Sequence, residues 1–162
     1  MAIIAYTDGS SLGNPGPGGY AAILLETEKK YKKEISQGFR MTTNNRMELW
    51  AVIAALEMLK NPQTEISIYT DSKYVCDSVE KKWVFGWEKK AFKGKKNEDL
   101  WRKFLPLYRK HKVRFHWVRG HAGNPFNERA DELAVAAAHS KNLKTDTGFE
   151  VEKPSDGINF AD

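Results

Sequence analysis

The sequence predicts a mixed α/β fold in which one five-stranded sheet carries helices on its faces. Strand-like and helix-like stretches follow one another in the order βββ-α-β-α-α-β-α. Short connections between the first three strands favour antiparallel pairing. The fourth strand follows a helix, and a strand–helix–strand crossover favours parallel pairing. Strands four and five are therefore expected to run parallel to strand one.

The first three strands are separated by turn-forming residues. Strand one ends at Asp8-Gly9, and the following stretch, 9–19, is rich in glycine, serine, asparagine and proline. That composition predicts a loop or a tight hairpin connection. The three strands are expected at residues 2–8, 19–27 and 32–40.

Residues 45–60 predict the first helix, because they are strong helix formers with apolar side chains on almost every face. Such a helix is expected to be buried on most sides. Asn61-Pro62 ends it. The alternation over residues 65–70 then predicts strand four.

The second half of the chain predicts two helices, a strand and a last helix. Asn124 is a plausible N-cap for that last helix, with Pro125 in its first turn. These elements are expected at residues 72 to about 87, 98–111, 113–118 and 125–140. We interpret residues 1–142 as one domain, and the polar, aperiodic residues 143–162 as a loosely ordered tail.

Composition limits the class of protein. A chain of 162 residues with 41% hydrophobic and 29% charged residues suits one globular domain. The formal net charge of +5 suits a polyanionic partner, nucleic acid or an acidic membrane, without deciding for either. Cys76 is the single cysteine, which fits a reducing compartment. The N-terminus lacks a signal-peptide pattern, and no apolar run suits a membrane span, so a cytoplasmic protein is expected.

Two aspartates end predicted strands, and each has an ordinary structural explanation. Asp8 precedes Gly9 and could be a turn residue. Asp71 precedes Ser72 and a helix, so it could be an N-cap. Because strands one and four are expected to be parallel neighbours, Asp8 and Asp71 should also lie side by side, at the sheet edge where α/β proteins bind ligands.

Two further carboxylates lie on predicted helices. Glu48 follows Asn45 at the spacing of a capping box, so its carboxylate could simply reach back to the helix start. Asp131 lies in line with an inward-facing alanine stripe, where a carboxylate is costly unless paired or metal-bound. It also lies in the second turn, where the helix dipole favours negative charge. Clustered carboxylates would need a cation, and hard oxygen ligands indicate Mg²⁺ or Mn²⁺.

Four blocks of sequence resemble the motifs of type 1 ribonucleases H, the bacterial ribonuclease HI family. The similarity spans roughly residues 2–152 in the order of the family. The blocks are Thr7-Asp8-Gly9-Ser10, Asn44-Asn45-Arg46-Met47-Glu48, Thr70-Asp71-Ser72, and Gly120-His121-Ala122-Gly123 followed by Asn127-Glu128-Arg129-Ala130-Asp131.

The resemblance implies a ribonuclease H-like fold and a monomeric endonuclease that cuts the RNA strand of RNA–DNA hybrids, leaving 5′-phosphate and 3′-hydroxyl ends. It implies two Mg²⁺ ions, with Mn²⁺ as a substitute. The implied metal ligands are Asp8, Glu48, Asp71 and Asp131. His121 is implied to assist proton transfer or product release, although a surface loop histidine is the plainer interpretation.

The resemblance also implies substrate contacts. Asn14, Asn44 and Asn45 are expected in the minor groove, where an amide can both donate to and accept from a 2′-hydroxyl. Asn14 could equally form a turn, and Asn45 a helix cap. Thr43 and Asn97 match the phosphate-holding positions of the family.

Residues 81–97 interleave seven lysines with aromatic side chains. A run of lysines is usually a solvated face, but interleaved aromatics favour nucleic acid. The stretch resembles the basic protrusion of the family, which grips the DNA strand. Its substrate-binding candidates are Trp83, Trp87, Lys89 and Lys90. One departure is Met41, where the family often has an arginine in the phosphate pocket.

Two other functions stay open. The chain could be another metal-dependent nuclease or a strand-transfer enzyme of the same fold. It could also be a non-catalytic hybrid-binding module, although such a module would be expected to lack one or more of the carboxylates.

Overall fold

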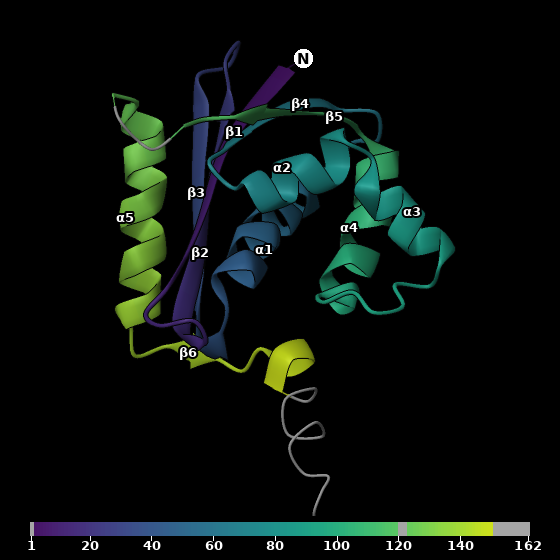
Figure 1. The fold of residues 1–162 in the computed structure, drawn as a ribbon. Coiled ribbons are helices and arrows are strands. Elements are labelled where there is room, and N and C mark those ends of the chain that lie inside the picture. Colours follow the sequence, from purple (N-terminus) through teal and green to yellow (C-terminus); the bar gives the residue numbers. More distant parts are fainter. Residues whose placement is uncertain (1, 120–122, 151–162) are drawn as a thin grey trace, which may run out of the picture.

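The computed structural model describes residues 2–119 and 123–150, and these form a mixed sheet covered by helices on both faces (Figure 1). The described residues contain six strands in the order β5-β4-β1-β2-β3-β6. The strands are β1 (Ala2–Ser11), β2 (Gly16–Glu26), β3 (Tyr31–Thr42), β4 (Glu65–Thr70), β5 (Lys112–Trp117) and β6 (Leu143–Lys144).

The strand directions are those expected from the sequence. β1, β2 and β3 form an antiparallel meander, β4 runs parallel to β1, and β5 runs parallel to β4. The number of strands differs, because β6 adds a short parallel pairing to β3. Two residues are too few to show a periodic pattern, so this strand could not be foreseen from local sequence.

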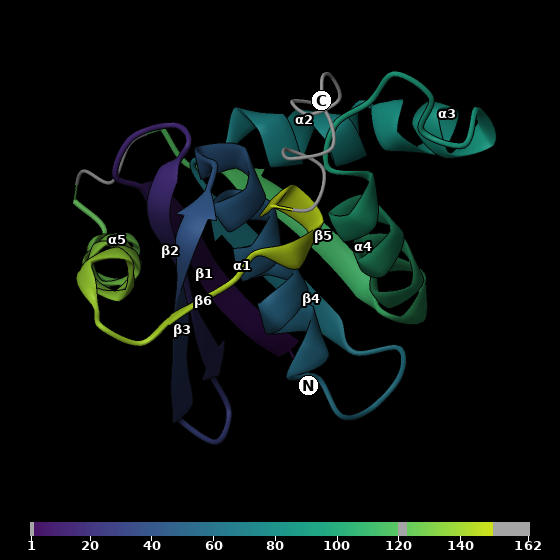
Figure 2. The same ribbon diagram turned by 90° about the horizontal axis from the view of Figure 1, so that it is seen from below.

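The helices lie in two layers. α5 packs on β1, β2 and β3, and α1 packs on the opposite face together with α2 and α4 (Figures 1 and 2). The helices are α1 (Asn44–Glu57), α2 (Lys73–Glu80), α3 (Trp83–Lys89), α4 (Glu98–Lys110) and α5 (Pro125–His139). No helix in the described ranges combines the length and apolar character that a bilayer span needs.

α1 is the centre of the core, as its apolar composition predicts. Met47, Leu49, Val52, Ile53 and Leu56 have no exposed surface. Each such side chain stabilises the fold by roughly 2 kcal/mol relative to exposure, so α1 is held from several sides. The start of α1, where Glu48 lies, is therefore fixed relative to β1.

The single helix expected over residues 72–87 is wrong. Lys82 has φ 64°, in the left-handed region, and separates α2 from α3. In a continuous helix Val79 and Val84 would point about 140° apart. The break lets both valines enter the core, where they are 2% and 0% exposed.

The C-terminal segment also differs from the expected loosely ordered tail, as far as residue 150. Leu143 and Lys144 pair with β3, and residues 147–150 form one helical turn. Asp146 is buried and bonded to Arg46. The buried Arg46–Asp146 ion pair explains why this polar segment is ordered. An ion pair between distant residues leaves no periodic pattern in the sequence, so the order was not predicted. The remainder of the expected tail, 151–162, lies outside the described residues.

Candidate active site

Three carboxylates converge where β1, β4 and α1 meet. The parallel register pairs Tyr6 with Tyr69, so Asp8 of β1 lies level with Asp71, the residue that follows the end of β4. Glu48 reaches them from the second turn of α1. One carboxylate oxygen from each of Asp8, Glu48 and Asp71 lies within 4.8 Å of the others.

Gly9 permits this close approach. A Cβ at Gly9 would overlap the backbone of Met47 and Glu48, so only glycine lets β1 lie against the start of α1. The Gly9 N–H also donates to Asp8 Oδ1 at 2.9 Å. The Asp-Gly pair thus serves the packing of the site.

The ordinary explanations for these carboxylates do not hold. Asp8 is inside β1, opposite Ala21 of β2, and not in a turn. The N-cap of α2 is Ser72, whose Oγ accepts from the N–H of Val75 at 3.1 Å. The N-cap of α1 is Thr43, so Glu48 lies beyond the position that a capping box requires.

Asp131 adjoins the group from the other side. It is half-buried in α5, and its carboxyl interacts with that of Asp8 both by charge and by a side-chain hydrogen bond. It does not belong to the group whose oxygens meet within 4.8 Å. Asp8 therefore interacts with Asp131 as well as with the other members of the group.

The electrostatics of the cluster call for a cation. Burial, then the charges of Asp71 and Asp131, raise the pKa of Asp8 from 3.8 to about 8. Burial, then the charges of Asp8 and Asp71, raise the pKa of Glu48 well above its ordinary value. Glu48 Oε1 is buried and accepts no hydrogen bond from the described residues. A cluster of hard oxygen donors whose charges raise one another's pKa fits Mg²⁺ or Mn²⁺.

The asparagines expected in the minor groove lie at the start of α1 and in the connection between β1 and β2. Asn14, Asn44 and Asn45 are all exposed. Asn14 lies in the connection between β1 and β2, and its Oδ1 accepts from the backbone N–H of Asn44 at 3.1 Å. Asn45 is not the helix cap, because that position belongs to Thr43.

Thr43 and Asn97, the expected phosphate-holding residues, meet around a residue that the sequence did not single out. Thr43 Oγ1 accepts from the backbone N–H of Arg46 at 3.3 Å. Asn97 Oδ1 accepts from the Arg46 guanidinium at 3.4 Å. Arg46 is 1% exposed. Arg46 is a charged residue in α1, a helix with apolar side chains on almost every face. That combination was the sequence signal that could have indicated a buried, ion-paired arginine.

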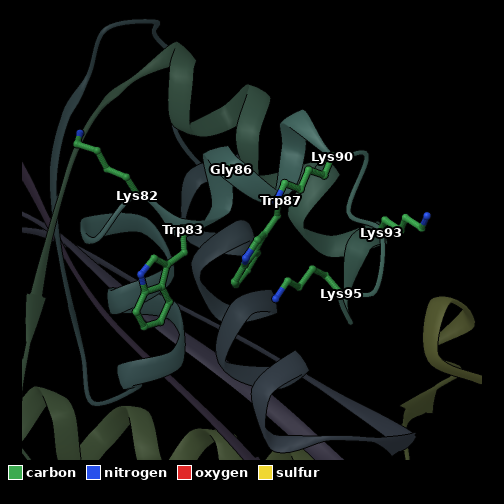
Figure 3. A pocket seen from close by; sticks show the side chains of 7 residues that line it. All are labelled: Lys82, Trp83, Gly86, Trp87, Lys90, Lys93 and Lys95. Atoms are coloured by element: carbon green, nitrogen blue, oxygen red, sulfur yellow. The ribbon is translucent and has the colours of Figure 1, made fainter.

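The lysine-rich stretch surrounds a hollow of about 310 Å³ on α3 and the loop after it (Figure 3). Trp83 is 47% exposed, and Lys95 Nζ lies 5.2 Å from the centre of the Trp87 ring. Lys89 is exposed but does not line the hollow. The hollow is lined by Lys82, Trp83, Gly86, Trp87, Lys90, Lys93 and Lys95.

His121 cannot be placed relative to the cluster, because it lies outside the described residues. The other expected site residues are all described. The structure brings Asp8, Glu48 and Asp71 together, places Asp131 against Asp8, and separates these from the lysine-rich hollow on α3.

Known proteins are similar to this chain in sequence. A protein called Ribonuclease H from Nitratidesulfovibrio vulgaris (strain Miyazaki F) is 53% identical over 150 residues, which cover 90% of this chain and 94% of that protein. Ribonuclease HI from Synechocystis sp. is 46% identical over 152 residues, 91% of this chain and 94% of that protein.

Solved structures of ribonucleases H have a similar fold. LC9-RNase H1, described as a type 1 RNase H with the type 2 active-site motif, has a TM-score of 0.76 at 32% identity, covering 95% of this chain and 81% of its own. LC11-RNase H1 in complex with RNA/DNA hybrid has a TM-score of 0.64 at 25% identity, covering 84% and 96%. The RNase H family model matches residues 1–139. The chain therefore belongs to the ribonuclease H family.

Proposed function

We propose that this protein hydrolyses the RNA strand of RNA–DNA hybrids in a reaction that depends on divalent metal ions. The convergence of Asp8, Glu48 and Asp71 within 4.8 Å is the observation that carries the proposal. Family membership and the fold shared with LC11-RNase H1, which was solved with RNA/DNA hybrid, support it.

Asp8, Glu48, Asp71 and Asp131 would hold two Mg²⁺ ions, which Mn²⁺ could replace. Two ions bound there would supply a water of lowered pKa and charge compensation at the leaving 3′ oxygen, giving 5′-phosphate and 3′-hydroxyl ends. Asp8, whose carboxyl interacts with those of Glu48, Asp71 and Asp131, would hold metal together with each of them. His121 is the proposed aid to proton transfer or product release.

Selection of the hybrid would fall to side chains around the cluster. The exposed amides of Asn14, Asn44 and Asn45 suit 2′-hydroxyls in the minor groove. Thr43 and Asn97 would hold a phosphate of the DNA strand. Further along the DNA strand, the hollow on α3 would bind the sugar-phosphate backbone through its lysine side chains and the faces of its tryptophan rings.

Competing functions make different predictions for one experiment. We expect the protein to act as a monomer in the cytoplasm. In Mg²⁺ it should cut the labelled RNA strand of a hybrid and leave duplex DNA and duplex RNA intact. Another nuclease of this fold would cut duplex DNA or duplex RNA. A binding module would retain the hybrid in a gel shift without cutting it. Either of these two results would refute the proposal.

A further inference from the structure

The C-terminal segment 143–150 returns across the sheet to the starts of α1 and α4 (Figures 1 and 2). It leaves the end of α5, pairs with β3 through β6, and then turns toward α1. Two ion pairs fix its far end: Arg40 with Glu150 at the surface, and Arg46 with Asp146 inside.

Arg46 lies between two carboxylates and contacts both in a bidentate manner. Its Nε and Nη2 donate to Asp146 Oδ2 and Oδ1 at 2.7 and 2.8 Å. Its Nη1 and Nη2 donate to Asp99 Oδ1 and Oδ2 at 2.8 and 2.7 Å. Paired planar contacts of this kind fix orientation as well as distance.

Asp146 is a built partner and not a passing surface contact. It is 2% exposed, and its Oδ2 also accepts from the hydroxyl of Thr42 at 2.7 Å. Burial acts to lower the pKa of Arg46, but the hydrogen bonds to Asp99 and Asp146 outweigh burial and raise that pKa. The guanidinium therefore stays charged.

Gly148 provides a second, independent sign that the segment is fitted to this network. A Cβ built at Gly148 would overlap the Asp99 carboxylate and lie 2.8 Å from Arg46 Nη2. A side chain at position 148 would therefore displace the Asp99 carboxylate and disturb the Arg46–Asp99 pair.

Arg46 also contacts both residues assigned above to a substrate phosphate. Its backbone N–H donates to Thr43 Oγ1 and its Nη1 to Asn97 Oδ1. The amide group of Asn97 donates in turn to Tyr74 Oη at 3.0 Å. Thr43 and Asn97 belong to different elements, the starts of α1 and α4. Arg46 connects them through its backbone N–H on the Thr43 side and its guanidinium on the Asn97 side.

We propose that residues 143–150 are a positioning element for the phosphate site, in which Asp146 holds the Arg46 guanidinium, and the guanidinium holds Asn97 at the spacing from Thr43 that the DNA strand requires. The inference rests on the hybrid-binding role proposed above. Without the Asp146 charge, a buried guanidinium loses half of its carboxylate partners. It then shifts toward its remaining carboxylate partner, Asp99.

The test is the Asp146→Asn variant, which keeps the shape of the side chain and removes its charge. We expect KM for the hybrid to rise about tenfold, the equivalent of one charge-assisted hydrogen bond, with kcat within about twofold of the wild type. Calorimetric binding of Ca²⁺ to the carboxylate cluster should not change. A purely structural role would lower the melting temperature and leave KM as it was.

A double-mutant cycle tests whether Asp146 affects hybrid binding through Asn97. If Asp146 acts through Asn97, then Asp146→Asn should change KM by less than about twofold in an Asn97→Ala background, because the side chain to be positioned is gone. Effects that multiply independently would overturn the inference. An Asn97→Ala variant with the KM of the wild type would also overturn the inference. That result would leave the proposed RNA-cleaving activity unaffected.

Two further variants guard against misfolding. Ile35→Ala, on β3 far from its Thr42 end, removes a half-buried side chain and should cost stability without raising KM. Gly148→Ala leaves every charge in place, and it should raise KM in the same direction as Asp146→Asn. If Gly148→Ala and Asp146→Asn raise KM no more than Ile35→Ala, measured where all three are folded, the inference is wrong.

Discussion

Asp8 illustrates a conflict between stability and function at the scale of one residue. It is buried beside other carboxylates, and its pKa is raised from 3.8 to about 8, first by burial and then by Asp71 and Asp131. A raised carboxyl pKa means that the charged form destabilises the metal-free fold. The burial of Asp8 beside other carboxylates therefore lowers the stability of the metal-free protein at neutral and higher pH.

The metal-free Asp8→Asn variant should accordingly be more stable than the wild type at pH 8. One pKa unit corresponds to about 1.4 kcal/mol, so we expect a gain of at least about 1 kcal/mol and a melting temperature roughly 2–4 °C higher. Asp77→Asn, which removes a carboxylate paired with Lys81 at the surface of α2, is the matched control and should not gain stability. An unchanged or lower melting temperature for Asp8→Asn in EDTA would contradict the assigned electrostatics.

The same comparison has a pH dependence of fixed sign. The stability linked to protonated Asp8 is fully present below its ordinary pKa of 3.8 and is lost as pH rises through about 8. Asn is neutral throughout, so the advantage of Asp8→Asn should grow between pH 5 and pH 8. Calorimetric scans in EDTA would measure it. Saturating Mg²⁺ should reverse the order of the two proteins, and an advantage that shrinks with pH would sink this explanation.

The sequence located the carboxylates but not the arginine. Asp8 and Asp71 could be placed together from strand order alone, because parallel neighbours end at one edge of the sheet. Arg46 belongs to a matched block, yet nothing local indicates that Asp99 and Asp146, far away in the chain, both bind it. Contacts of such long range are set by tertiary packing, which local pattern does not encode.

At the scale of elements, boundaries that depend on one backbone angle were the hardest to foresee. Residues 72–87 have the composition of one helix, but Lys82 adopts φ 64° and divides it. Burial of Val79 and Val84 decides this, since a continuous helix would expose one of them. By contrast, α1 was foreseeable because its apolar residues can only be buried.

Lys82→Gly should stabilise the protein by about 0.5–1 kcal/mol, because glycine takes the left-handed conformation without the clash that a side chain meets there. Lys81→Gly is the matched control. Lys81 has φ −88°, so glycine there adds only flexibility and should destabilise. Urea unfolding of both variants gives the comparison. If Lys82→Gly is the less stable of the two variants, the left-handed conformation of residue 82 does not strain the wild-type protein, and this explanation is wrong.

At the scale of the whole molecule, the charge of +5 is not spread evenly. Lys90, Lys93 and Lys95 surround one hollow on α3 together with two tryptophans (Figure 3). Lys29, Lys30 and Lys33 lie around the hairpin between β2 and β3. The two groups carry equal charge in different places, which separates the effect of local binding from that of net charge.

Replacing Lys90, Lys93 and Lys95 by Gln should raise KM for the hybrid and reduce the slope of log KM against log salt, by roughly 0.7–0.9 for each phosphate that the protein no longer neutralises. The same replacement of Lys29, Lys30 and Lys33 changes net charge equally and should leave most of the slope in place. Equal effects of the two triple variants would show that the hollow on α3 does not bind the hybrid specifically.

The central claim is that the carboxylates of Asp8, Glu48 and Asp71 act together as a metal centre for RNA cleavage. The single-turnover rate of RNA-strand cleavage by Asp8→Asn, with hybrid and Mg²⁺ both saturating, tests it most directly. We predict a folded protein that cuts at least about a thousandfold more slowly than the wild type, because several kcal/mol of charge stabilisation in the transition state are removed. A rate close to that of the wild type would contradict the claim.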